Sequence, residues 1–194
     1  MATRKRLSQE DSQRAALLAA RELLIENGPQ SLTLKAVAAR IGRTHSNLLH
    51  HFGSAAGLQK ALAGFLADSI CASIAQAVAK RRTGEGSARE LVDLVFDAFG
   101  REGAGALASW TMVSGNRDTL DPIFDTIHNL VEDLSPEGED WRLVREVTMS
   151  LVLQALGDAT IGDALAQSLD LPRERAREIA TRQLIAMLPR GENV

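Results

Sequence analysis

Apolar residues recur along nearly the whole chain at the three- and four-residue spacing of an α-helix. Glycine, proline and capping residues separate the stretches that carry this spacing, so each stretch has a recognisable start and end. No stretch shows the sustained alternation of a half-buried strand, and alanine, leucine, glutamate and arginine, which favour helices, are abundant. The 194-residue chain is therefore predicted to be all-α.

About nine helices are predicted from these boundaries. They are expected near residues 9–27, 34–41, 44–51, 54–82, 87–101, 106–113, 119–134, 140–165 and 172–188. The short second and third helices are joined by a tight turn at Gly42, which is the pattern of a helix-turn-helix. We expect a three-helix domain over residues 1–53 and a larger helical domain over 54–194, with helix 54–82 linking the two. Helix 140–165 is apolar almost all round between Val147 and Ile161, so it is expected to be deeply buried.

Charge is distributed unevenly along the chain. The formal net charge is −3, but the first 60 residues hold nine basic and four acidic residues, while the rest of the chain is acidic. Three of the basic residues, Arg4, Lys5 and Arg6, form an N-terminal arm. This distribution indicates that contacts with phosphates are confined to the N-terminal part of the chain.

Several classes of protein are disfavoured by simple counts. The single cysteine, Cys71, excludes an internal disulfide and a cysteine-based zinc site, and its apolar neighbours are typical of a small buried side chain. The charged N-terminus lacks the apolar run of a signal peptide, and no segment is expected to supply the roughly 20 apolar residues of a membrane span. We expect a cytoplasmic protein that binds no membrane, metal or cofactor.

Residues 16–58 resemble the N-terminal domain of the TetR family of transcriptional regulators. The matching residues keep the family's order and spacing without a gap: Ala19-Ala20, Leu23, Glu26-Asn27-Gly28, Thr33, Val37-Ala38, Gly42, Leu48, His50-His51-Phe52, Ser54 and Leu58. The later helices agree with the family only in number, length and hydrophobicity. The resemblance implies a sequence-specific DNA-binding regulator, a repressor that a small-molecule effector releases from operator DNA.

The third helix begins with polar residues that could read base edges in the major groove. Phosphate contacts at Thr33, Lys35, Thr44, His50 and His51 are carried over from the resemblance. The complete set of predicted DNA-binding residues is Thr33, Lys35, Arg43, Thr44, His45, Ser46, Asn47, His50 and His51. The family usually has tyrosine at the position of Leu49 and lysine at that of Ala55, so backbone contacts are expected to be weaker here.

The resemblance also implies a homodimer, formed through the last two long helices, and an effector pocket between the other helices of the body. Candidate pocket residues, which are also typical of an ordinary helical core, are Phe96, Phe99, Trp110, Met112, Phe124 and Met149. Because few charged residues are predicted inside, the effector is expected to be apolar or weakly polar.

Two other functions have weaker support in the sequence. An enzyme has little: Asp121, Asp125, His128 and Glu132 share a helical face and could suggest a metal site, but they lie opposite an apolar stripe, as a solvated face does. The glycines between Gly100 and Gly105 follow no strand, so they are a weak phosphate-loop signal. A helical ligand-binding or interaction protein with weakened DNA binding is favoured by Leu49 and Ala55.

Overall fold

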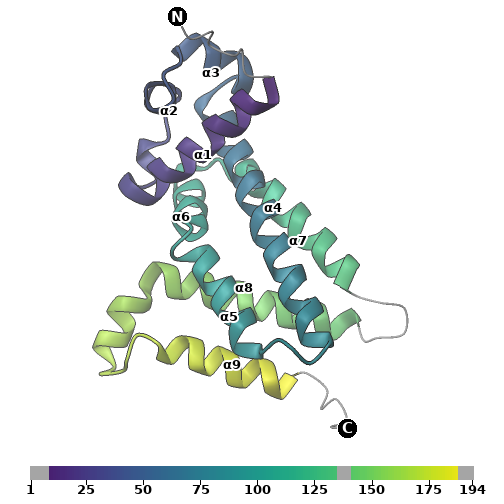
Figure 1. Cartoon of the computed structure of the whole chain (residues 1–194). Coiled ribbons are helices and arrows are strands. Elements are labelled where there is room, and N and C mark those ends of the chain that lie inside the picture. Colours follow the sequence, from purple (N-terminus) through teal and green to yellow (C-terminus); the bar gives the residue numbers. More distant parts are fainter. Residues whose placement is uncertain (1–8, 135–140, 188–194) are drawn as a thin grey trace, which may run out of the picture.

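The structure is a computed structural model, and it describes residues 9–134 and 141–187. These residues form α-helices and two short 3₁₀ helices, with no strand among them (Figure 1). The elements are α1 (Gln9–Asn27), η1 (Pro29–Ser31), α2 (Leu34–Arg40), α3 (His45–Phe52), α4 (Ala55–Arg82), α5 (Ala88–Phe99), α6 (Ala104–Ser114), η2 (Arg117–Leu120), α7 (Asp121–Leu134), α8 (Trp141–Ser168) and α9 (Arg175–Met187). The all-α prediction is confirmed, and within this part of the chain the nine predicted helices are found.

Side-chain caps fix the starts of four of these helices. The hydroxyl oxygens of Thr33, Thr44, Ser54 and Ser87 each accept a hydrogen bond from the backbone N–H three residues later, at distances of 3.0 to 3.2 Å. Each bond satisfies a donor that a helix N-terminus would otherwise leave unpaired.

The first hydrophobic core joins α1, α2 and α3, here called the head, to the helices below them. Leu48 of α3 and Val37 of α2 are fully buried in it. The same core includes Leu58 and Leu62 of α4 and Leu107 of α6. The head therefore rests on α4 and α6, and the two-domain division at residue 53 stays a prediction.

The second hydrophobic core lies between α5, α8 and α9, around Phe96. Arg177 of α9 lies over the Phe96 ring, 5.4 Å from its centroid, and pairs with Asp93 at 2.9 Å and Asp97 at 2.6 Å. Burial raises the pKa of Asp93, but hydrogen bonds from Arg89 and Arg177 outweigh burial and hold the pKa below its ordinary value. These contacts fix α9 against α5.

The expectation that α8 is deeply buried is met on one face only within the single chain. Val147, Leu151 and Ala155 are buried, whereas Leu153 and Ile161 on the same helix are exposed. The helices of a single chain cover one face of α8, against which α5, α6, α7 and α9 pack. An apolar face is left open on the other side.

The expectation that no segment could form a membrane span also needs correction. By length and composition alone, the 28 residues of α4 are long and apolar enough to cross a membrane. In the structure Leu58, Leu62 and Leu66 of α4 are buried in the first core, and α7 packs along the same helix. A helix that packs in a protein core can be as long and as apolar as a helix that spans a membrane. The length and composition of α4 are therefore weak evidence of a membrane span.

Candidate functional sites

The predicted helix-turn-helix is present in the head. α2 and α3 are joined by a turn in which Gly42 has a φ of +64° and the Arg43 N–H donates to the Ala38 carbonyl at 2.9 Å. A φ in this range favours glycine because other side chains would clash with the backbone. Leu48 and Phe52 are buried under α3, and they fix which face of that helix points outward.

The outward face of α3 is formed by four exposed side chains. They are His45, Ser46, Leu49 and His50. The His51 side chain is half-buried, with its ring centroid 6.2 Å from that of Phe52 and 5.7 Å from that of the exposed His50. This face offers hydroxyl and imidazole groups around one apolar side chain, Leu49.

Asn47 is placed differently from its predicted role. It is half-buried, and its Oδ1 is buried with no hydrogen-bond partner among the described residues. Its backbone N–H donates to the hydroxyl oxygen of Thr44, the residue that caps α3. The sequence placed Asn47 in the polar run with Ser46, but the helical rotation between them turns Asn47 toward the head.

Some of the cations beside this face are exposed, and one is held in ion pairs. Lys35, in the first turn of α2, and Arg43, just before α3, are exposed, as are the capping residues Thr33 and Thr44. Arg40, at the end of α2, is held by Glu26 at 2.5 Å and by Glu22 at 3.3 Å. Hydrogen bonds from Arg40 lower the pKa of Glu26, so this carboxyl stays charged and keeps the arginine engaged.

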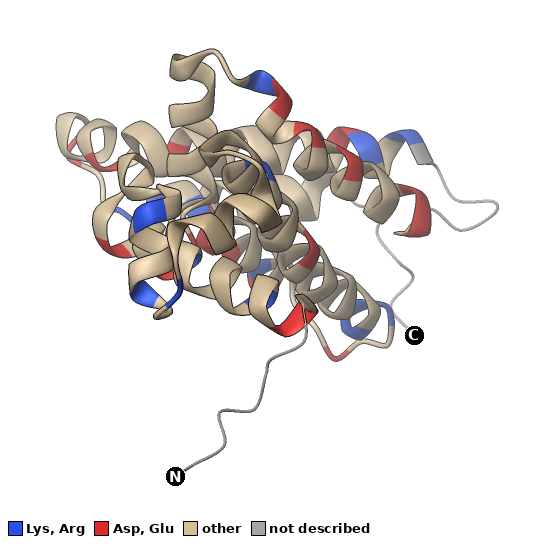
Figure 2. Ribbon diagram, turned by 90° about the horizontal axis from the view of Figure 1, so that it is seen from above, with Lys and Arg blue, Asp and Glu red and all other residues tan. Residues whose placement is uncertain are grey.

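Seen from above, the Lys and Arg positions along the ribbon of the described residues are interspersed with those of Asp and Glu (Figure 2). The predicted arm of Arg4, Lys5 and Arg6 lies outside the described residues. The basic excess of the first 60 residues therefore depends in good part on that arm.

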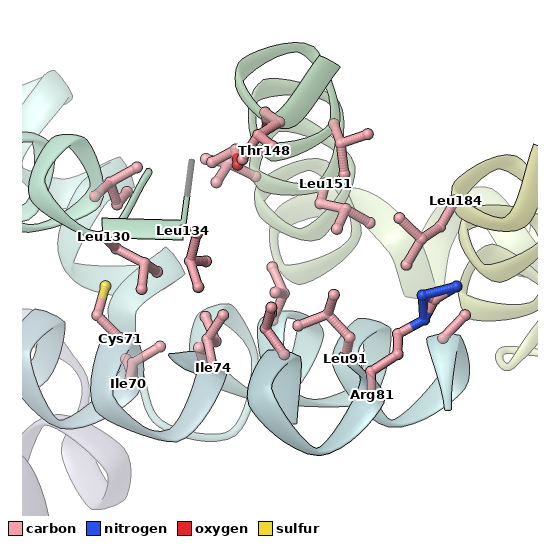
Figure 3. A pocket seen from close by; sticks show the side chains of 18 of the residues that line it. Ile70, Cys71, Ile74, Arg81, Leu91, Leu130, Leu134, Thr148, Leu151 and Leu184 are labelled. Carbon is pink, nitrogen blue, oxygen red and sulfur yellow. The ribbon is translucent and has the colours of Figure 1, made fainter. Parts of the chain in front are cut away.

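A cavity of about 840 Å³ lies in the body, between α4, α5, α7, α8 and α9 (Figure 3). Aliphatic side chains form most of its wall, among them Ile70 and Ile74 of α4, Leu130 of α7 and Leu151 of α8. The lining residues with polar side chains are Cys71, Arg81, Arg82 and Thr148, and no Asp or Glu is among those described. Burial and the charge of Asp68 raise the pKa of Cys71 to about 11, so its thiol stays protonated.

The structure places one of the six predicted pocket residues, Phe99, at the wall of this cavity. Phe96 is buried in the second core and borders a smaller groove of about 340 Å³ between α8 and α9. The other four, Trp110, Met112, Phe124 and Met149, are exposed, so their prediction as cavity-wall residues needs correction. Helical spacing identifies an apolar face but not what that face packs against. The missed lining residues include Ile70, Ile74 and Val78, which recur at helical spacing along α4.

The acidic face of α7 is occupied by ion pairs. Asp121 lies 3.4 Å from the Lys60 ammonium, and Glu132 pairs with Arg145. Within residues 9–134 and 141–187, no three His, Cys, Asp or Glu side chains come together as metal ligands. The arrangement of the α7 carboxylates is that of a solvated surface.

Comparison with known proteins agrees with this description. Residues 16–62 match the family model described as bacterial regulatory proteins, tetR family. No curated protein of similar sequence was found. A similar solved structure is a protein from Rhodococcus sp. described as a TetR-family transcriptional regulator, with a TM-score of 0.60, 17% identity, and coverage of 91% of this chain and 98% of that one.

A second similar structure is the multidrug binding protein EbrR complexed with ethidium. Its TM-score is 0.58 at 18% identity, with coverage of 90% of this chain and 98% of that one. At these identities the two structures show only that the fold is shared along nearly the whole chain. The family model matches the head and the first turns of α4. Residues 16–62 therefore match a tetR-family regulatory domain, and nearly the whole chain shares the fold of the two solved structures.

Proposed function

We propose that this chain is a repressor that binds operator DNA as a homodimer and is released by a small apolar effector held in the cavity. The observation that carries the proposal is the exposed face of α3, which buried Leu48 and Phe52 hold outward. A helix presented in this way can enter the major groove and place side chains at base edges.

The proposed contacts divide into two groups. His45, Ser46 and His50 are exposed on α3 and would reach bases. Lys35 and Arg43 are exposed beside α3 and would meet phosphates, as would the first backbone N–H groups of α2 and α3, next to Thr33 and Thr44. Asn47 and His51 are half-buried and stay predictions.

The proposed dimer uses the open faces of α8 and α9. Leu153 and Ile161 of α8 and Ile179 and Ile185 of α9 are exposed in the single chain. A second copy related by a two-fold axis would cover both faces at once, in a four-helix interface. Such a dimer places two α3 helices at successive major grooves, and its operator is a palindrome.

The proposed effector site is the cavity. Its volume of about 840 Å³ falls within the range of pockets for small organic ligands, and its wall is largely apolar. The structure of EbrR, with its ethidium, supports ligand binding by this fold. α4 lines the cavity over residues 66–82 and also packs in the core of the head, so an effector that changes the position of α4 would change the spacing of the two heads.

We infer no catalytic role, and we place the protein in the cytoplasm with its DNA. The first test is selection of bound duplexes from a random pool by the purified protein. The expected result is a palindrome whose half-sites lie about one helical turn or more apart. Recovery of no sequence above background from the effector-free protein would refute the operator-binding proposal.

A second candidate function is a ligand-binding protein whose head binds DNA weakly. The exposure of Leu49 on α3, where the family usually has tyrosine, favours it. Salt dependence separates the two candidates, because an operator binder loses affinity steeply as salt rises, whereas a protein that makes few phosphate contacts does not.

A further inference from the structure

The wall of the cavity is apolar at one end and positively charged at the other. α4 contributes lining residues from Leu66 to Arg82, a span of about 24 Å along the helix axis. Figure 3 shows Ile70, Cys71 and Ile74 toward one end and the guanidinium of Arg81 at the opposite end, beside Leu184. The space thus extends along α4, and the guanidinium of Arg81 lies at one end of it.

The two arginines at this end differ in what they contact. The Arg82 Nη2 donates to the carbonyl of Leu134 at 2.6 Å, so Arg82 is bound to the end of α7. Arg81 is half-buried, and its guanidinium has no hydrogen bond or ion pair with the described residues. Partly removing a cation from water without a partner costs free energy.

Arg81 is an exception among the half-buried arginines of the described chain. Arg21, Arg89, Arg175 and Arg177 each pair with a carboxylate, at distances between 2.5 and 3.2 Å. Arg81 instead borders a cavity whose described lining contains no Asp or Glu. The missing partner of this guanidinium would be supplied by whatever occupies the cavity.

We infer that the cavity takes an elongated apolar molecule with a carboxylate at one end, and that Arg81 pairs with this carboxylate. The inference rests on the proposed function, in which the cavity holds the effector. An aliphatic wall suits an alkyl chain, and a guanidinium matches a carboxylate in charge and in its forked geometry. An organic cation such as ethidium is disfavoured, because the described lining offers it Phe99 as its aromatic residue and no carboxylate.

The experiment uses three ten-carbon probes that differ in their head groups: decanoate, 1-decanol and decyltrimethylammonium. Binding to the full-length protein is measured by calorimetry below the concentrations at which the probes aggregate. We expect decanoate to bind about tenfold more tightly than decanol, because a charge-assisted hydrogen bond is added. Equal affinities for these two probes, or tighter binding of the ammonium probe, would overturn the inference.

Substitutions of Arg81 test whether this residue is the partner of the carboxylate. Arg81→Gln should remove the preference for decanoate over decanol, and Arg81→Lys should retain part of it. Lys80→Gln is the matched control, because Lys80 is the adjacent exposed cation on α4 and does not line the cavity. An unchanged preference in Arg81→Gln, or an equal loss in Lys80→Gln, would show that Arg81 is not the partner.

A further measurement locates the probe. Cys71 lies in the wall, so bound decanoate should slow its alkylation by N-ethylmaleimide. Unchanged alkylation at saturating decanoate would mean that the probe binds elsewhere, which also overturns the inference. Operator selection by the effector-free protein is independent of these probes, so failure of that selection counts against the proposed function alone.

Discussion

α2 carries two cations that the structure places in different states, and this difference can be measured in DNA binding. Lys35 is exposed and forms no ion pair with the described residues, while Arg40 is engaged by Glu22 and Glu26. A cation already bound to carboxylates releases few counterions when DNA arrives. We expect Lys35→Gln to reduce the salt dependence of operator binding and Arg40→Gln to leave it nearly unchanged.

The size of the effect follows from counterion release. Removing one contact between a cation and a phosphate lowers the slope of log affinity against log salt by about 0.9. The substitution removes two Lys35 cations from a dimer, so the slope should fall by about 1.8. Between about 50 and 200 mM salt, the wild-type affinity should therefore fall about tenfold more than that of Lys35→Gln.

The assay is fluorescence anisotropy of the labelled operator, titrated with each protein at several salt concentrations. A nonspecific duplex is titrated in parallel, because a phosphate contact affects all sequences alike. Equal changes of slope in the two variants would refute the reasoning. So would a weakening in Lys35→Gln that is confined to the operator, since that would indicate base reading.

Three further predictions follow from other parts of the structure. The exposed Leu49 would contact a thymine methyl, so the wild-type protein should prefer dT over dU about fourfold at one operator position, and Leu49→Ala should abolish this preference. The test is to select the operator and then replace each dT with dU in turn. Ile161→Glu should give a monomer in sedimentation, whereas Val113→Glu, at a side chain that is 87% exposed on α6, should remain a dimer. Asp93→Asn should lower the melting temperature at neutral pH and should have less effect in strong acid. The lowered pKa of Asp93 stabilises the fold above the ordinary value of 3.8, and this stabilisation is lost as the pH falls through the folded pKa. Equal melting differences at both pH values would contradict this last expectation.

The helices of the head could be predicted closely because their signals are local. Thr33 and Thr44 form caps with atoms three residues away, and Gly42 supplies a turn between two short helices. The outward face of α3 was predicted less well. Asn47 lies beside Ser46 in the sequence, and only the packing of Leu48 decides that one of them turns toward the head and the other away from it.

The cavity was harder to predict because its wall is assembled from distant segments. Leu66 and Arg82 of α4, Leu130 of α7 and Leu184 of α9 meet there, and the spacing within each helix shows only that it has an apolar face. Aromatic and methionine side chains were the predicted wall because they are large and often line pockets. Most of those side chains are on the surface, and smaller aliphatic residues enclose the space.

α8 shows most clearly where reasoning from one chain fails. Its sequence is apolar on both sides, and the spacing of apolar residues does not tell which of its neighbours come from the same chain. In the structure α5 and α9 pack against the side of Leu151 and Ala155, while Leu153 and Ile161 stay exposed. A protein with such a surface either associates or exposes a large apolar patch to water. The same sequence pattern therefore supports a dimer, in which the second neighbour of α8 is the α8–α9 face of another copy, and the comparison of Ile161→Glu with Val113→Glu tests that reading directly.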